Sequence, residues 1–147
     1  MNRHPSPSAS APHGVSWPLV LSLGALALVR PLMNVTGITE AIGSPWAQLS
    51  ATLLVTLAWV TAVLVAQVPR PFLTLVCAGV AYGVLAILLS AVLSPLLGEG
   101  LQGPLTNPFA MVSVLAVNAV WGAVAGGLAL VVGTALGRGS GRVSGRG

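Results

Sequence analysis

An arginine stands inside an apolar stretch near the start of this chain. Arg30 follows Trp17 by thirteen residues, which places it roughly 20 Å along a helix axis at about 1.5 Å per residue. An arginine that deep in a membrane span costs on the order of a few kcal/mol unless it is paired or reaches the interface. Its guanidinium could bind an anion or a lipid headgroup, or pair with Glu40 or Glu99. In the simpler interpretation, its long side chain only extends to the nearby interface.

A second polar residue, Asn118, lies in another apolar stretch, one helical turn before Trp121. A buried carboxamide needs hydrogen-bond partners, which membrane helices supply across their interfaces at roughly 0.6–2 kcal/mol each. Such bonds would hold helices together, whereas a polar seam lining a solute path would show the same residue types. The candidate partners are the threonines of the second apolar stretch and a tyrosine of the third: Thr52, Thr56, Thr61 and Tyr82.

Groups that commonly perform catalysis are missing from the apolar stretches. These stretches contain no Asp, Glu, His or Lys, and both histidines, His4 and His13, lie in the polar N-terminal segment. The sequence offers no paired carboxylates, metal-ligand cluster, Ser/His pair or phosphate-binding glycine loop. Small four-helix multidrug exporters have a similar length, but they depend on a glutamate in the first helix that this chain lacks. We therefore expect no enzymatic activity, metal or cofactor.

The composition indicates that lipid surrounds most of the chain. Hydrophobic residues make up 55% of the 147 residues and charged residues only 5%, against roughly 25% charged in ordinary soluble domains. A soluble fold needs charged side chains to cover its exterior. All six basic residues are arginine, which together with the abundant Ala, Gly and Val hints at a GC-rich bacterial genome.

Four apolar runs are each about long enough to cross a membrane. Spanning a hydrocarbon core of about 30 Å takes about 20 residues of α-helix, and backbone facing lipid must be helical because its polar groups need internal partners. The sequence thus predicts an all-α, four-helix transmembrane bundle, with a disordered tail over 1–14 and an Arg/Gly/Ser tail over 138–147. The expected helices are about 15–33, 46–68, 72–93 and 109–136.

The arginines predict the orientation of the bundle. Arginine in short loops favours the cytoplasmic side, and both glutamates, Glu40 and Glu99, fall in loops without a basic residue. Both termini and the 68–71 turn should therefore be cytoplasmic, in a multi-pass protein of the cell membrane. Five arginines support this orientation: Arg3, Arg70, Arg138, Arg142 and Arg146.

Small residues form ridges on the third and fourth runs. Glycines four residues apart let membrane helices approach closely, and two such pairs are Gly79 with Gly83 and Gly122 with Gly126. These faces could pack against each other within one chain or against a second copy. We favour packing within the chain, because such glycine pairs are common in membrane helices.

The two hairpins show similar punctuation. Pro31 and Pro45 are 14 residues apart, and Pro95 and Pro108 are 13 apart; in each pair the first is followed by Leu and the second by an aromatic residue and Ala. The pattern fits an internal duplication with a parallel repeat, or independent use of proline at helix ends. Ser94 matches Arg30 in this alignment, which favours the simpler interpretation of Arg30.

Three segments, over 28–37, 68–97 and 101–122, carry a resemblance of this chain to known bacterial membrane proteins. It resembles small, uncharacterised four-helix integral membrane proteins of actinobacteria and related bacteria, and the resemblance implies the topology without an activity. We expect a non-enzymatic accessory or oligomeric membrane component whose partners are the lipid bilayer and a second copy or a larger membrane protein. Its C-terminal arginines would attract anionic lipid, not nucleic acid. The alternative is a small transporter or permease subunit that passes a neutral or anionic solute near Arg30 and Asn118.

Overall fold

The computed structural model describes residues 14–43, 45–96 and 104–143. Over these residues the protein is all-α, with no strand, and four helical stretches are long and apolar enough to cross a membrane. The fold is the four-helix membrane bundle that the sequence predicts. The spans run over Trp17–Val35, Trp46–Val65, Pro71–Leu96 and Pro108–Gly137.

The first span is broken into two helices. Helix α1 covers Trp17–Ala27 and α2 covers Val29–Val35, with Leu28 between them. Pro31 explains the break, because it has no N–H to offer the carbonyl of Ala27, four residues earlier, and its ring crowds that carbonyl. The break therefore falls two residues before Arg30, so Arg30 lies in the first turn of α2, beside the proline that causes the break.

A short helix, α3 (Ile38–Ile42), turns the chain back toward the membrane. Helix α2 ends at Val35, and Gly37 follows with a φ of +74°, the left-handed conformation that glycine adopts just beyond helix ends. The hydroxyl of Thr39 donates a hydrogen bond to Asn34 Oδ1 at 2.7 Å and ties α3 to α2. The sequence predicts a loop here, and the structure shows a compact helical corner.

Helix α4 (Trp46–Val65) leads through a tight turn into α5 (Pro71–Leu96). The amide of Val68 donates to the carbonyl of Val63, and that of Gln67 to the carbonyl of Leu64, a Schellman cap of the α4 end. Gln67 occupies the left-handed position with φ +48°. Pro71 opens α5, where the missing N–H has no intrahelical partner to lose.

Helix α6 (Pro108–Val143) follows a single 3₁₀ turn, η1 (Pro104–Thr106). The helix continues past Gly137 to Val143, through the start of the Arg/Gly/Ser segment that the sequence predicts to be a tail from residue 138. Continuation is geometrically simple because each added residue extends an existing hydrogen-bond ladder. Each glycine there costs about 1 kcal/mol relative to alanine, so this stretch is the weakest part of α6.

Helices α5 and α6 pack backbone against backbone. A Cβ atom on Gly79 would collide with the backbone carbonyl oxygen of Asn118, and one on Gly122 with that of Leu75. A Cβ on Gly126 would lie 2.8 Å from the Cα of Phe72, closer than carbon atoms approach. Gly83 instead faces the side chains of Leu115 and Asn118. Glycine is thus required at this crossing within one chain.

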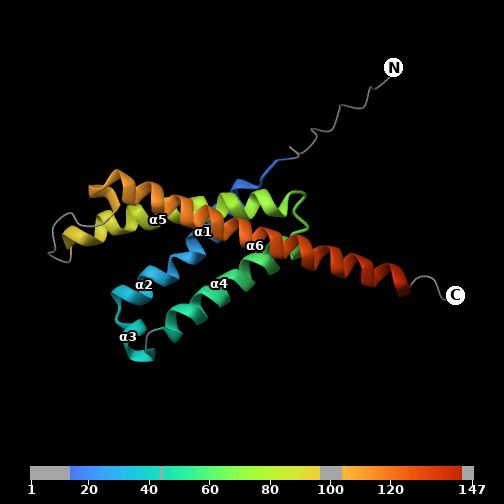
Figure 1. Cartoon of the computed structure of the whole chain (residues 1–147), viewed down its shortest axis with the longest axis horizontal. Coiled ribbons are helices and arrows are strands. Elements are labelled where there is room, and N and C mark those ends of the chain that lie inside the picture. Colours follow the sequence, from blue (N-terminus) through green and yellow to red (C-terminus); the bar gives the residue numbers. More distant parts are fainter. Residues whose placement is uncertain (1–13, 44, 97–103, 144–147) are drawn as a thin grey trace, which may run out of the picture.

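The four spans meet in a core and then diverge (Figure 1). Helices α5 and α6 form one arm, and α2, α3 and the first half of α4 form another. The start of α1, the α4–α5 turn and the end of α6 lie on one side; α3 and η1 lie on the other, which we call the α3 side. The core that joins the arms is apolar and buried: Leu23, Ala27, Val55, Trp59, Val63, Leu75, Ala78, Ala125 and Ala129.

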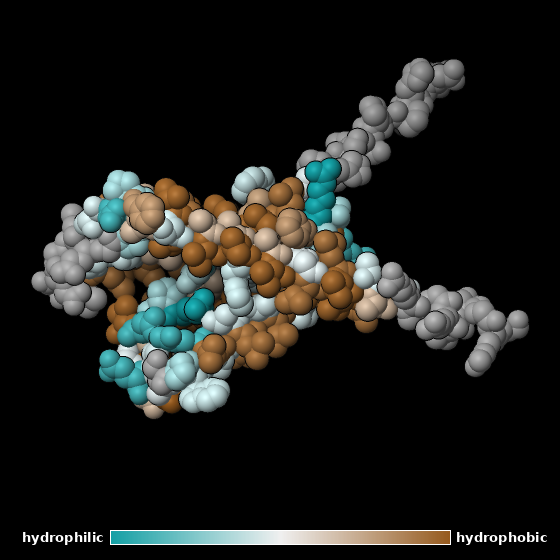
Figure 2. Space-filling model, viewed as in Figure 1, coloured by the Kyte–Doolittle hydropathy of each residue, from teal (hydrophilic) through white to brown (hydrophobic). Residues whose placement is uncertain are grey.

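On the face shown in Figure 2, the outside of the bundle is mostly apolar, whereas hydrophilic residues gather in the hollow between the two arms. Large apolar side chains on the outside are exposed in the isolated chain, among them Leu53, Leu54, Val117 and Val131. Lipid tails are the solvent that suits such a surface. The protein is therefore a multi-pass membrane protein with a polar interior at one end.

Candidate functional site: a polar vestibule at Arg30

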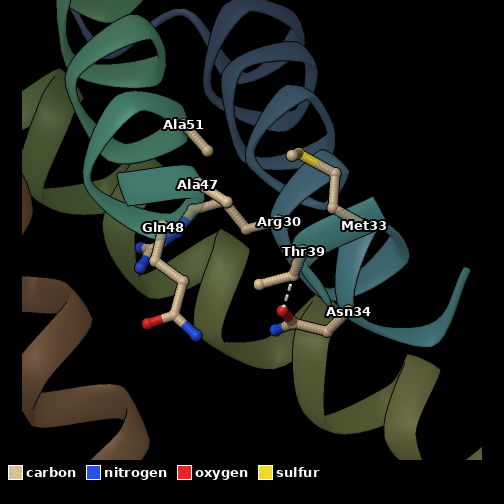
Figure 3. Close-up of a pocket in the computed structure, with 7 residues that line it drawn as sticks. All are labelled: Arg30, Met33, Asn34, Thr39, Ala47, Gln48 and Ala51. Atoms are coloured by element: carbon tan, nitrogen blue, oxygen red, sulfur yellow. Dashed lines mark hydrogen bonds between the residues drawn. The ribbon is translucent and has the colours of Figure 1, made fainter. Parts of the chain in front are cut away.

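A cavity of about 210 Å³ opens between α2, α3 and α4 on the α3 side. We call this cavity the vestibule. Its walls carry one charged residue and three neutral polar ones, drawn in Figure 3 with the small and apolar residues beside them. Helix α2 supplies three lining residues, α3 one and α4 three: Arg30, Met33, Asn34, Thr39, Ala47, Gln48 and Ala51.

Helix geometry brings these side chains together. Arg30 and Asn34 are four residues apart on α2, and Ala47 and Ala51 are four apart on α4, so each pair lies on one helix face. The break before Pro31 directs the α2 pair toward α4. Figure 3 shows the Arg30 side chain extending from α2 toward the start of α4, where Gln48 lies.

Arg30 is half-buried, and its charge has no counter-charge in the described parts of the chain. Within residues 14–43, 45–96 and 104–143, its guanidinium forms neither an ion pair nor a hydrogen bond. Glu40, one of the two expected partners, is exposed and does not line the vestibule. Glu99, the other, lies outside the described residues. The guanidinium therefore keeps its donors available toward the cavity.

The neutral side chains add further donors. Thr39 is only 8% exposed, and its hydroxyl occupies Asn34 Oδ1 at 2.7 Å (Figure 3). Because the amide oxygen of Asn34 accepts this bond, its NH₂ group remains available as a donor. The carboxamide of Gln48 supplies another NH₂ group on the α4 wall. Positive charge with several N–H donors is the arrangement that recognises an anionic oxygen group.

Beneath the vestibule, Arg30 also lines a second, much smaller space of about 10 Å³. Asn118, Trp121 and Tyr82 form part of its wall, and its size is about that of one water molecule. The two polar candidates of the sequence, Arg30 and Asn118, thus meet at one space deep in the bundle. Helices α1, α4, α5 and α6 contribute the remaining lining residues: Ala27, Thr52, Val55, Trp59, Tyr82, Asn118 and Trp121.

The hydrogen bonds near this space differ from those expected of Asn118. Its Nδ2 donates to the carbonyl of Val114 in its own helix at 2.7 Å, so this bond does not join helices. The link between α6 and α4 comes from Trp121, whose Nε1 donates to Thr56 Oγ1 at 3.2 Å. Thr61 is exposed and takes no part. The residue that joins the two helices is therefore Trp121, one turn after Asn118, and not Asn118 itself.

Apolar packing closes the site from below. Trp59, Val63, Leu75 and Ala129 are at most 1% exposed, and they fill the bundle between the small space and the opposite side. The vestibule is therefore a blind cleft in this conformation. It can hold a ligand from the α3 side, and a solute could pass only if these helices moved apart.

The glycine candidates lie apart from the vestibule. Gly79, Gly83, Gly122 and Gly126 line the crossing of α5 and α6, where they set the distance between the helices. The sequence interpretation did not single out Asn34, Thr39 or Gln48 as site residues. The four-residue spacing from Arg30 to Asn34 is the signal that could have found Asn34; nothing local predicts that α3 carries Thr39 back to it.

Comparison with protein families, curated proteins and solved structures finds no match to this chain. The resemblance to small four-helix bacterial membrane proteins therefore stays a prediction.

Proposed function

We propose that this protein is a non-enzymatic, multi-pass component of the cell membrane that binds an anionic group in the Arg30 vestibule. One observation carries the proposal: a half-buried arginine inside a membrane span faces a cavity lined by further N–H donors, without a carboxylate partner among the described residues. A side chain serving only as a membrane anchor would point outward to the headgroups, whereas Arg30 lies between the helices and lines both the vestibule and the small space beneath it.

The energetics support a ligand. Arginine in a membrane span is costly by about 2.5–3.5 kcal/mol on insertion scales, and a charge-assisted hydrogen bond returns about 1.5–3 kcal/mol. One bound anionic group could accept two parallel bonds from the guanidinium. The ligand would then offset the cost of placing Arg30 there.

We also propose that the termini are cytoplasmic and that the vestibule opens outward. The support is the arginine distribution of the sequence, since the α3 side has Glu40 and the terminal side has Arg70. Single cysteines at Gly14 and at Thr36, in a Cys77→Ser background, test this in intact cells. A membrane-impermeant maleimide should label only the cysteine at 36, and labelling at 14 alone would reverse the orientation.

As an accessory component, the protein would act beside a second copy or a larger membrane protein. Glycine contacts between α5 and α6 are already made within one chain, so a complex would use other lipid-facing surfaces. Cross-linking in native membranes should capture one constant partner. Recovery of the monomer alone would contradict the accessory role while leaving anion binding untouched.

A small transporter is the second candidate. The observation that favours it is the small space beneath the vestibule, which Arg30 and Asn118 both line. The packed core around Trp59 argues for binding without passage in this conformation. Flux of an anion into proteoliposomes that is lost in both Arg30→Gln and Asn118→Ala would favour transport.

Thermal unfolding in a non-ionic detergent tests anion binding. Phosphate, sulfate and acetate are titrated separately, because a ligand that binds only the folded protein raises its unfolding temperature by mass action. At least one anion should stabilise the wild type, and Arg30→Gln should abolish the shift. Arg70→Gln, in the exposed α4–α5 turn, is the matched control and should keep it. Equal shifts in all three proteins would contradict the proposal.

A further inference from the structure

An apolar groove adjoins the vestibule along the same two helices. It encloses about 420 Å³ between α1–α2 and α4 and opens on the outer surface of the bundle, a volume typical of ligand pockets. Met33 and Ala51 line both the groove and the vestibule, so the two spaces are adjacent. Apart from Ser50, the described residues that line the groove are apolar: Leu26, Val29, Met33, Ile42, Ala51, Leu54, Val55 and Ala58.

The groove has a direction relative to the membrane. On α4 the vestibule is lined by Ala47 and Gln48, and the groove then follows Ala51, Leu54, Val55 and Ala58 at helical spacing along one face. Ala58 lies twelve residues after Trp46, roughly 18 Å along the axis at about 1.5 Å per residue. The polar end is therefore near the membrane surface on the α3 side, and the apolar end reaches about the middle of the bilayer.

Helix α2 and the end of α1 show the same order. Asn34 and Arg30 line the polar vestibule, and Val29 and Leu26, earlier in the chain and deeper in the span, line the groove. On both walls the deepest lining residues, Leu26 and Ala58, are apolar, and the N–H donors lie toward the α3 side. A free anion would use only the first part of such a surface.

We propose that the ligand is an anionic lipid of the leaflet on the α3 side, with its phosphate on Arg30 and one hydrocarbon chain in the groove. This deepens the proposed function and rests on it. Charge complementarity selects the headgroup, since Arg30 is the one charged residue among the described residues that line the vestibule, and Asn34 and Gln48 are neutral donors. The groove would take a hydrocarbon chain because the apolar part of a lipid contacts the groove once the lipid phosphate occupies the vestibule.

The experiment separates the headgroup from the chain. The full-length protein in a non-ionic detergent is titrated with phosphatidylglycerol, with phosphatidylcholine, and with glycerol 3-phosphate, which carries a phosphate but no chain; the unfolding temperature reports binding. Arg30→Gln removes the headgroup contact, and Ala58→Leu fills the deep end of the groove. Ala116→Leu, on an exposed position of α6 away from the groove, is the control for adding the same side chain.

Phosphatidylglycerol should stabilise the wild type more than either other ligand. Arg30→Gln should weaken its binding about tenfold or more, the loss expected for one charge-assisted hydrogen bond. Ala58→Leu should weaken phosphatidylglycerol binding and leave glycerol 3-phosphate binding unchanged, while Ala116→Leu changes neither.

Other results would overturn the inference. Equal phosphatidylglycerol binding by Ala58→Leu and the wild type would show that no chain occupies the groove. Glycerol 3-phosphate that stabilises as well as the lipid would assign the vestibule to a free anion, and in both cases the proposed function stands. Phosphatidylcholine that binds as well as phosphatidylglycerol would indicate an apolar groove with no headgroup selection. If Arg30→Gln binds phosphatidylglycerol and glycerol 3-phosphate as well as the wild type does, the proposed function is refuted as well.

Discussion

The indole Nε1 of Trp59 donates a hydrogen bond to the backbone carbonyl oxygen of Leu23 at 2.9 Å, joining α4 to α1 in the buried core. Trp59 is 1% exposed and its ring is the largest fully buried side chain among the described residues. It therefore fixes the spacing of the two helices that, further along, form walls of the apolar groove.

Replacing Trp59 with Phe should destabilise the fold through two effects. The hydrogen bond contributes about 0.6–1.7 kcal/mol in a membrane bundle, and the smaller ring leaves a cavity that adds to the loss. We expect a lower unfolding temperature in detergent. Trp17→Phe, at a position that is 64% exposed, should change it little, and equal effects of the two substitutions would contradict the role given to Trp59.

The α5–α6 crossing gives a second prediction. Alanine at Gly79 or Gly122 would place a Cβ against a backbone carbonyl, which cannot rotate away as a side chain can. The helices would have to separate, at about 1–3 kcal/mol as for other overpacked cores. Denaturation by dodecyl sulfate added to detergent micelles would measure the loss.

Gly127 supplies the control for those two variants. Gly127 lies on α6, as Gly122 does, yet a Cβ there meets nothing within 4 Å. Gly127→Ala should be neutral or stabilise the helix by about 1 kcal/mol through propensity alone. If Gly127→Ala destabilises as much as Gly79→Ala, contact between the helices is not the cause.

The membrane fold could be predicted because lipid imposes few choices on a chain. Four apolar runs of adequate length must be helices, since backbone facing lipid needs internal hydrogen bonds. Sequence also indicated the first span as unusual, through Arg30 and Pro31. The break at Leu28 follows from Pro31, but the direction of α2 after the break depends on contacts with α4 that no local pattern contains.

The site was predictable only in part for the same reason. Arg30 and Asn118 stand out as polar residues in apolar runs, and both line the small space. The vestibule needs Thr39 and Gln48, which are ordinary polar residues near helix ends. Their role depends on the way α3 folds back toward α2, a tertiary arrangement fixed by Gly37 and the Thr39–Asn34 bond.

Gln67 offers a test of backbone strain. It adopts a φ of +48° at the end of α4, a conformation that costs a non-glycine residue roughly 1–2 kcal/mol. Gln67→Gly should relieve this, with a net gain of about 0.5–1 kcal/mol after the larger entropy of the unfolded chain is counted. Gln67→Val should lower the unfolding temperature instead, because a β-branched residue is least tolerant of positive φ. The same sign for both variants would exclude strain at Gln67.

Two threonines should respond to the same substitution with opposite signs. Thr74 is fully buried, and its hydroxyl has no hydrogen-bond partner within the described part of the chain. Thr56 instead accepts the bond from Trp121 and donates to the carbonyl of Thr52 at 2.7 Å. Valine has nearly the shape of threonine without the hydroxyl, so it isolates the polar contribution.

Thr74→Val removes an unsatisfied buried group, whose desolvation costs about 1–3 kcal/mol, and should raise the unfolding temperature. Thr56→Val leaves the Trp121 indole N–H without its acceptor and should lower it, since the lost bond joins α6 to α4. Unfolding temperatures of both variants in one detergent provide the comparison. Destabilisation by Thr74→Val would mean that the Thr74 hydroxyl forms a hydrogen bond in the membrane. It would contradict the assignment of Thr74 as an unsatisfied buried group.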